Sequence, residues 1–248
     1  MTRIGDPGLN DLGAYGEGVR DERVRLLTES VATGDNRVGR LCAMAVDTLA
    51  VSGAGLSVSD GAGQQRKLAA TDEVSDRIED LQVLLGQGPC VDAVSTGAPV
   101  LVADLDGPDV ASRWPMFTPA ASALGVRATF SVPLLVGDLR LGAMDLYRGT
   151  VGPLVSRQVE EAEDFASAAV NVLLEMQAVT PGGSAASGMT GVGSSAVHQA
   201  TGMVMVQLDA DAEAAFAALR ARAYQEGRTL LEVARDVLER RLRLSDGE

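Results

Sequence analysis

A glycine- and serine-rich segment constrains this chain more than any other feature, because it divides the 248 residues into two folding units. Its centre reads TPGGSAASGMTGVG and contains no core-forming run. We predict a linker over residues 179–194, a first domain over residues 21–178 and a smaller domain over residues 195–244. Residues 1–20 are rich in glycine and aspartate and lack apolar periodicity, so we expect a disordered arm there.

The first domain alternates stretches of helical and strand periodicity. In chain order the pattern predicts a helix over 21–51, a hairpin over 55–70, a helix over 73–85, a short helix from 89, a strand over 99–104, a loop over 107–119, a hairpin over 128–147 and a long amphipathic helix over 156–177. Strands joined mainly as hairpins and flanked by helices indicate an α/β (α+β) domain built on an antiparallel sheet.

The smaller domain reads as three helices. Asp209 and Asp211 stand where a second helix would begin, and Gly227 stands where it would end. Thr229 and Glu232 have the spacing of a capping box, which predicts the start of a third helix. We therefore expect an all-α three-helix domain.

Charge is distributed unevenly along the chain. The net charge of −13 is unfavourable for nucleic-acid binding in general, because phosphate neutralisation supplies most non-specific affinity. Residues 219–243 are the exception, with seven arginines against four acidic residues. The C-terminal end is therefore the only basic segment of the sequence, and its positive charge comes purely from arginine.

Several classes of protein are disfavoured by what the sequence lacks. No apolar run approaches the roughly 20 residues that span a bilayer, so we expect a cytoplasmic protein without membrane association. Two cysteines and one histidine, His198, form no recognisable metal or haem site, and no nucleotide-binding or nucleophile motif is present. We predict neither a cofactor nor a metal, and no enzymatic activity.

The two cysteines differ in context. Cys42 lies on an apolar helical stripe, which favours a buried small hydrophobic residue. Cys90 follows Gly-Pro at a helix start, where a thiol pKa can fall. A redox role for Cys90 therefore stays open beside a structural one.

Four motifs in order carry a resemblance in the first domain. They are LLGQGPC at 84–90, RWP at 113–115, SVPL at 131–134 and LGAM at 141–144. With the predicted strand order, they resemble a GAF domain. The resemblance implies a sensory domain that receives an unknown small-molecule or protein signal. Some GAF-fold proteins reduce free methionine sulfoxide with cysteines, which leaves an enzyme as a further alternative.

The smaller domain resembles an ANTAR domain. The carrying residues are Gln199, Ala200, Gly202, Met205, Ala215, Phe216, Leu219, Arg220, Tyr224, Leu231, Val233 and Ala234. The resemblance implies a protein that binds RNA hairpins as a homodimer and prevents premature transcription termination. A GAF domain followed by an ANTAR domain is similar to regulators common in actinobacteria.

The candidate RNA-binding residues are polar side chains of the three predicted helices: Gln199, Arg220, Arg222, Tyr224, Arg228 and Arg235. An arginine and a tyrosine four residues apart on a helix suit stacking with unpaired loop bases. The alternative is a solvated face in which these arginines pair with Glu226 and Glu232.

The first helix of the smaller domain has an apolar seam at heptad spacing: Val197, Thr201, Val204 and Leu208. This seam fits either the core of one chain or a dimer contact. A second function is therefore also open, namely a ligand- or protein-binding GAF sensor whose ANTAR-like tail mainly dimerises.

Overall fold

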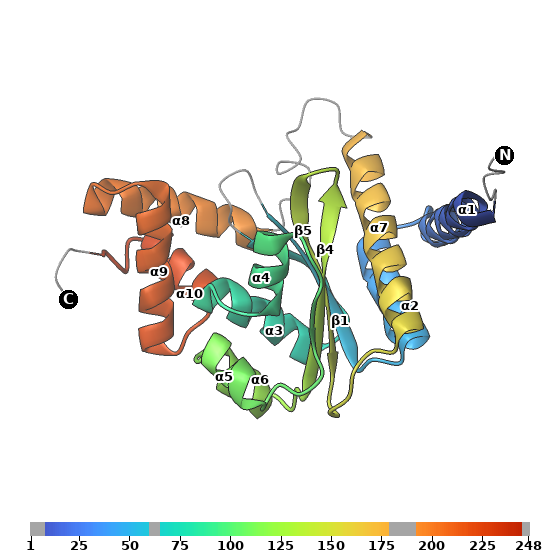
Figure 1. The fold of residues 1–248 in the computed structure, drawn as a ribbon. Coiled ribbons are helices and arrows are strands. Elements are labelled where there is room, and N and C mark those ends of the chain that lie inside the picture. Colours follow the sequence, from blue (N-terminus) through green and yellow to red (C-terminus); the bar gives the residue numbers. More distant parts are fainter. Residues whose placement is uncertain (1–7, 60–64, 179–191, 245–248) are drawn as a thin grey trace, which may run out of the picture.

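The computed structural model describes residues 8–59, 65–178 and 192–244. A five-stranded sheet with helices on both faces forms the larger unit, and three helices near the C-terminus form the smaller one (Figure 1). The predicted fold class, an antiparallel α/β domain followed by a helical domain, is confirmed. Among the described residues, no helix has the length and apolarity that crossing a membrane would need.

The sheet is antiparallel throughout and follows the order β2-β1-β5-β4-β3. Its strands are β1 (Gly53–Ser59), β2 (Gln65–Ala70), β3 (Val100–Val102), β4 (Ala128–Val136) and β5 (Leu139–Arg148). Successive side chains of a strand point to opposite faces. Along β5, Met144 and Leu146 therefore face one side of the sheet, while Asp145 faces the other.

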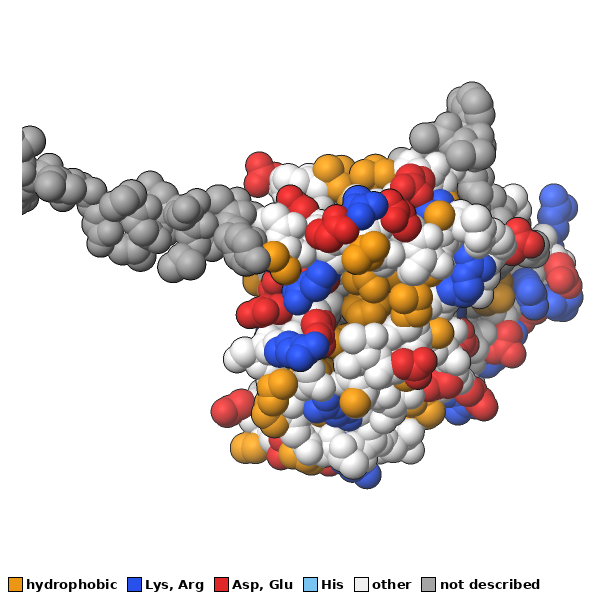
Figure 2. All heavy atoms as spheres, turned by 90° about the vertical axis from the view of Figure 1, so that its right-hand side faces the viewer, with side chains coloured by type: hydrophobic (Ala, Val, Ile, Leu, Met, Phe, Trp, Pro, Cys, Tyr) orange, Lys and Arg blue, Asp and Glu red, His pale blue; other side chains and the backbone are white. Residues whose placement is uncertain are grey.

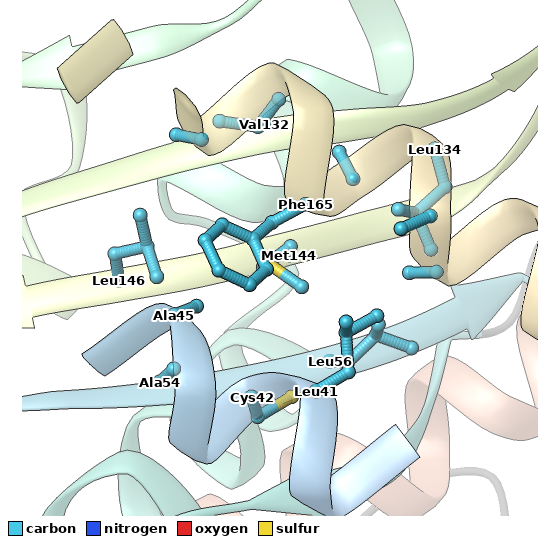
Figure 3. Close-up of a cluster of buried hydrophobic side chains, with 14 of the residues drawn as sticks. Leu41, Cys42, Ala45, Ala54, Leu56, Val132, Leu134, Met144, Leu146 and Phe165 are labelled. Carbon is cyan, nitrogen blue, oxygen red and sulfur yellow. The ribbon is translucent and has the colours of Figure 1, made fainter. Parts of the chain in front are cut away.

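One face of the sheet carries an aliphatic core. Helices α2 (Arg37–Leu49) and α7 (Ser156–Ala178) cover this face (Figure 1). Phe165 of α7 reaches down to Met144 of β5, and Leu41 of α2 lies near Leu56 of β1 (Figure 3). The predicted apolar stripe on α2 is buried here, including Cys42.

The opposite face is covered by shorter helices. These are α3 (Glu73–Leu85), α4 (Pro89–Thr96), α5 (Pro108–Arg113) and α6 (Phe117–Ala123). Their apolar contacts centre on Trp114 and Phe117, whose rings meet edge to face with centroids 6.1 Å apart. The predicted loop over 107–119 is wrong, because Pro108 occupies the first turn of α5, where its missing N–H costs no hydrogen bond.

The N-terminal region differs from the expected disordered arm. Helix α1 (Gly8–Ser30) already begins at Gly8, and residues 1–7 lie outside the described part. Arg20 and Arg23 of α1 pair with the buried Asp164 of α7, so packing against α7 supports a helix that apolar periodicity does not reveal.

The single helix predicted over 21–51 is two helices. Gly34 and Asn36 between α1 and α2 adopt left-handed backbone conformations, with φ of 82° and 57°. Such residues cannot continue a right-handed helix, so the chain turns between Ser30 and Arg37.

The smaller unit contains α8 (Val192–Leu208), α9 (Ala212–Glu226) and α10 (Leu230–Leu238). Asp211 caps α9 by accepting a hydrogen bond from Ala214 N, and Gly227 ends α9 in a left-handed conformation. The predicted capping box of Thr229 and Glu232 is present at the start of α10. Asp209 instead lies in the turn after α8, with φ of 47°. The predicted linker lies largely outside the described residues, and α8 begins at Val192.

We expect Phe165→Ala to lower the free energy of unfolding of the larger domain by about 3–5 kcal/mol, because it leaves a cavity in the aliphatic core. Denaturant titration checks this through the fluorescence of Trp114, the single tryptophan of the chain. Arg157→Ala on the same helix is the control, since the Arg157 side chain is 83% exposed and its loss should cost roughly 0.5 kcal/mol. Equal losses in the two variants would contradict the assigned core.

Candidate functional site

Helix α9 carries three of the six candidate RNA-binding residues, and a fourth, Arg228, follows its C-cap glycine. Ala215, Leu219 and Ala223 recur every four residues and form its buried face. Arg220 and Arg222 are separated by about 200° around the helix axis, at roughly 100° per residue. The structure therefore places them on different flanks of the buried face and does not bring all six candidates onto one surface.

Phe216 of α9 does not belong to the buried cluster of the three-helix unit. It is only partly buried, and Ala215 takes the core position beside Leu219. The guanidinium carbon of Arg220 lies 5.6 Å from the centroid of the Phe216 ring. Phe216 thus supports an arginine by a cation–π contact instead of filling the core.

Arg220 and Tyr224 lie one turn apart and differ in exposure. The Tyr224 side chain is 53% exposed and free to meet an unpaired base. Arg220 is partly buried, and its Nε atom is buried with no hydrogen-bond partner among the described residues. Burial lowers the pKa of the Arg220 guanidinium. A buried donor without an acceptor is unfavourable, so an arrangement that gives the Arg220 Nε a hydrogen-bond acceptor or exposes it to water would be favoured.

The C-terminal end of α3 covers Arg220. Leu84 packs against the core of the three-helix unit, and helices α3 and α9 are in contact (Figure 1). Gly86, the C-cap of α3, lies so close that an added Cβ would stand 2.6 Å from a terminal nitrogen of Arg220. The larger domain thus contacts a residue that is predicted from the sequence to bind RNA.

Arg222 and Arg228 belong to a network of ion pairs. Arg222 lies 2.6 Å from Glu226, and Arg228 lies 2.9 Å from Glu226 and 2.6 Å from Asp236. Hydrogen bonds from Arg228 hold the pKa values of Glu226 and Asp236 below their usual range. This arrangement matches the alternative of a paired surface for two of the arginines, except that Glu232 caps α10 with Thr229.

The other two candidates lie on the neighbouring helices. Gln199 of α8 and Arg235 of α10 are both exposed. The side chain of His198 lies outside what the structure describes.

The apolar seam of α8 packs within its own chain. Val204 is fully buried, and Val197 and Leu208 pack against the same cluster of α8, α9 and α10. Thr201 is 4% exposed and donates to the carbonyl of Val197 at 2.8 Å. The seam residues that are buried here are committed to the core of one three-helix unit.

Cys90 belongs to a second group of polar residues. This group lies between the sheet and the helices that cover the face opposite α2 and α7. Its Sγ lies 3.3 Å from Ser57 Oγ and 3.3 Å from Gln65 Oε1. Its backbone N–H donates to Gln82 Oε1 at 2.7 Å. Glu79 of α3 and Asp145 of β5 complete this group, and both carboxyl groups and the Cys90 thiol are buried.

The thiol pKa of Cys90 is not lowered by its place at a helix start. Burial raises the pKa of Cys90 well above its ordinary value, and the nearby Asp145 and Glu79 raise it further. Burial likewise raises the pKa of Cys42 to about 12. The two thiols lie on opposite faces of the sheet and are both free, so the fold does not bring them together as a redox pair.

Sequence reasoning missed Glu79 and Asp145, although each left a signal. Asp145 interrupts an apolar strand at an inward-facing position, and Glu79 lies among buried residues of α3 such as Ile78 and Gln82. A carboxylate on a buried strand or helix face is rarely found without a specific partner. The contact of α3 with Arg220 had no comparable signal, because it joins surfaces distant in sequence.

Three solved structures are among those similar to this chain. One is the GAF domain of an Acinetobacter phosphoenolpyruvate-protein phosphotransferase, with 10% identity, 65% of this chain and 96% of that chain covered, and a TM-score of 0.49. The second is a domain of a sensor histidine kinase protein from Sinorhizobium meliloti 1021, with 17% identity, 59% and 94% coverage, and a TM-score of 0.48. The third is the free methionine-R-sulfoxide reductase of Thermoplasma acidophilum, with 17% identity, 60% and 96% coverage, and a TM-score of 0.45.

A comparison with curated proteins finds no match. Family models match the chain in two consecutive regions. Residues 36–173 match the GAF domain, and residues 193–238 match the ANTAR domain. Both are domain types of regulatory proteins. The GAF match spans more than half of the chain and coincides with the sheet and its covering helices. The chain therefore belongs to the GAF domain family and carries an ANTAR domain after its GAF domain.

Proposed function

We propose that this protein is a cytoplasmic, signal-responsive regulator that binds RNA hairpins through its ANTAR domain and acts by transcription antitermination. The match of α8, α9 and α10 to the ANTAR domain is the observation that carries the proposal. Exposed Tyr224 offers a stacking surface, and the arginines around it offer charge for phosphates. The GAF domain would act as the sensor.

The contact between the two domains supplies a mechanism for control. Arg220 lies one turn from Tyr224, but α3 of the GAF domain covers its guanidinium. Separation of α3 from α9 would expose Arg220 beside Tyr224 and complete an arginine–tyrosine pair for an unpaired base. A signal that favours the separated arrangement would therefore favour RNA binding.

A second copy of the chain is expected to bind the side of the GAF domain formed by α1 and α7. This side displays hydrophobic side chains among charged ones (Figure 2). Leu26 of α1 is 53% exposed and Leu174 of α7 is 43% exposed. A groove between the two helices is lined by Val24 and Leu174 and by charged residues. Dimerisation here would present two ANTAR domains to paired hairpins.

We expect Tyr224→Ala to weaken binding of a cognate RNA hairpin roughly 5- to 150-fold, because one base–aromatic stacking contact contributes about 1–3 kcal/mol. The hairpin would be recovered by crosslinking the protein to RNA in its host cells and sequencing the fragments. Binding of the full chain would be followed by fluorescence anisotropy. Arg157→Ala is the control, since Arg157 is an 83% exposed arginine of the GAF domain.

Salt dependence separates the proposal from a sensor whose ANTAR-like tail mainly dimerises. An RNA contact made by several arginines should lose affinity steeply as salt rises. Wild-type affinity in Tyr224→Ala, together with a flat salt dependence, would favour the dimerising tail and refute the RNA site.

We expect Leu84→Ala to raise RNA affinity roughly 3- to 10-fold, because it removes the apolar contact that holds α3 over Arg220. The same anisotropy titration measures the change, and Trp114 fluorescence shows whether the GAF domain stays folded. Leu101→Ala, at a 44% exposed leucine of β3, is the matched control. Unchanged affinity in folded Leu84→Ala would show that the contact does not regulate RNA binding.

A further inference from the structure

Two carboxyl groups and a thiol lie close together on the face of the GAF sheet opposite α2 and α7. Glu79 is 1% exposed, Cys90 is fully buried and Asp145 is 4% exposed. One ligating atom from each, a carboxylate oxygen or the Cys90 sulfur, lies within 4.8 Å of the other two. They come from α3, α4 and β5, so the fold itself assembles the group from distant parts of the chain.

The surroundings of this group are neutral hydrogen-bonding side chains. Among the described residues, the side chains of Ser57, Gln65, Gln82 and Ser131 form hydrogen bonds with the side chain of Cys90 or Asp145. Lys67 opposes the rise in the pKa of Glu79, but its ammonium already pairs with Asp76 and Asp80 at 2.6 and 2.9 Å. The two carboxyl groups therefore meet little compensating positive charge.

Glu79 provides an independent sign of a missing partner. Its Oε2 atom is buried and meets no hydrogen-bond donor in the described part of the chain. The side chain fills the space above Gly55 of β1, where an added Cβ would lie 2.4 Å from Glu79 Oε1. Gly55 is paired with Asp145 across the sheet, so the glycine gives Glu79 room to approach Asp145.

A proton shared between two carboxyl groups accounts for only part of this arrangement. It would relieve the repulsion between Glu79 and Asp145, but it gives no role to the sulfur beside them. A cation bound by all three groups compensates each of them, because buried charges are stabilised by pairing or by metal coordination.

We propose that Glu79, Cys90 and Asp145 bind a divalent transition-metal ion of the zinc class. Zinc binds thiolate sulfur at about 2.3 Å and carboxylate oxygen at about 2.0–2.2 Å, so ligand atoms within 4.8 Å need only small side-chain rotations to share one ion. The thiolate selects such an ion over magnesium or calcium, which prefer oxygen ligands. On binding, the thiol proton passes to solvent.

This site is placed to influence the ANTAR domain. Glu79 and Leu84 belong to the same helix, α3, and Gly86 caps it over Arg220. An ion that draws Glu79 towards Asp145 would shift α3 relative to α9. This influence depends on the proposed RNA binding, whereas the metal site does not.

The test uses the full chain, stripped of metal with a chelator and then titrated with Co²⁺. One equivalent of Co²⁺ should produce a thiolate-to-cobalt charge-transfer absorption in the near ultraviolet, and Zn²⁺ should displace it. Cys90→Ser should abolish this absorption and weaken binding at least about tenfold. Cys42→Ser should keep both, because Cys42 lies in the core on the other face of the sheet.

Two further variants guard against a folding defect in Cys90→Ser. Glu79→Gln and Asp145→Asn keep side-chain size and should each weaken Co²⁺ binding at least about tenfold, while circular dichroism and Trp114 fluorescence stay native. The proposal is overturned if the wild type shows no saturable charge-transfer absorption, or if that absorption survives in Cys90→Ser. Native-like carboxylate variants with wild-type affinity would also overturn it. None of these outcomes depends on RNA.

Discussion

The alternation of side chains along β5 is the constraint on which the rest of the GAF domain depends. Met144 and Leu146 point into the aliphatic core under α2 and α7, and Asp145 between them points to the other face. Because the side-chain period of a strand is two, a shift of register by one residue would exchange the two environments and bury the carboxylate among aliphatic groups. The pairing of β5 with β1 and β4 sets Gly55 and Ser131 beside Asp145. One face of the sheet thus packs against the aliphatic core, and the other carries the buried group of Glu79, Cys90 and Asp145.

Helix α3 links this buried group to the ANTAR domain. Its capping box at Asp72 and Ser75 and its glycine C-cap fix both ends, so it behaves as a short rigid element. Its middle carries Glu79 and Gln82 towards Cys90 and Asp145, and its end places Leu84 and Gly86 against α9. A change at the buried carboxylates therefore need not travel through the described β-strands to reach α9. It can act as a rigid displacement of one helix, and the unpartnered Nε of Arg220 indicates that the present contact is not optimal for that arginine.

Local pattern predicted the parts of this structure that local physics determines. The strands, α3, the three C-terminal helices and the Thr229–Glu232 capping box follow from periodicity and capping chemistry, and they appear where these place them. The failures came where distant segments decide. Helix α1 is supported by α7 through Asp164, and Arg220 is covered by α3. The raised thiol pKa of Cys90 comes first from burial and then from the carboxyl groups of Asp145 and Glu79, whereas the local sequence shows only a helix start, which would lower it.

The ion pairs of the ANTAR domain limit how much free energy its arginines could contribute to RNA binding. Arg222 and Arg228 already satisfy Glu226 and Asp236, so a phosphate must replace a carboxylate partner instead of meeting a free cation. Such exchange leaves a carboxylate that must be solvated, which reduces the net gain from each contact. Under the proposed function, such a surface would give weak non-specific attraction in a chain of net charge −13, and recognition of bases would depend on Tyr224 and Arg220. Since α3 covers Arg220, the proposed RNA surface would gain this arginine only after α3 separates from α9.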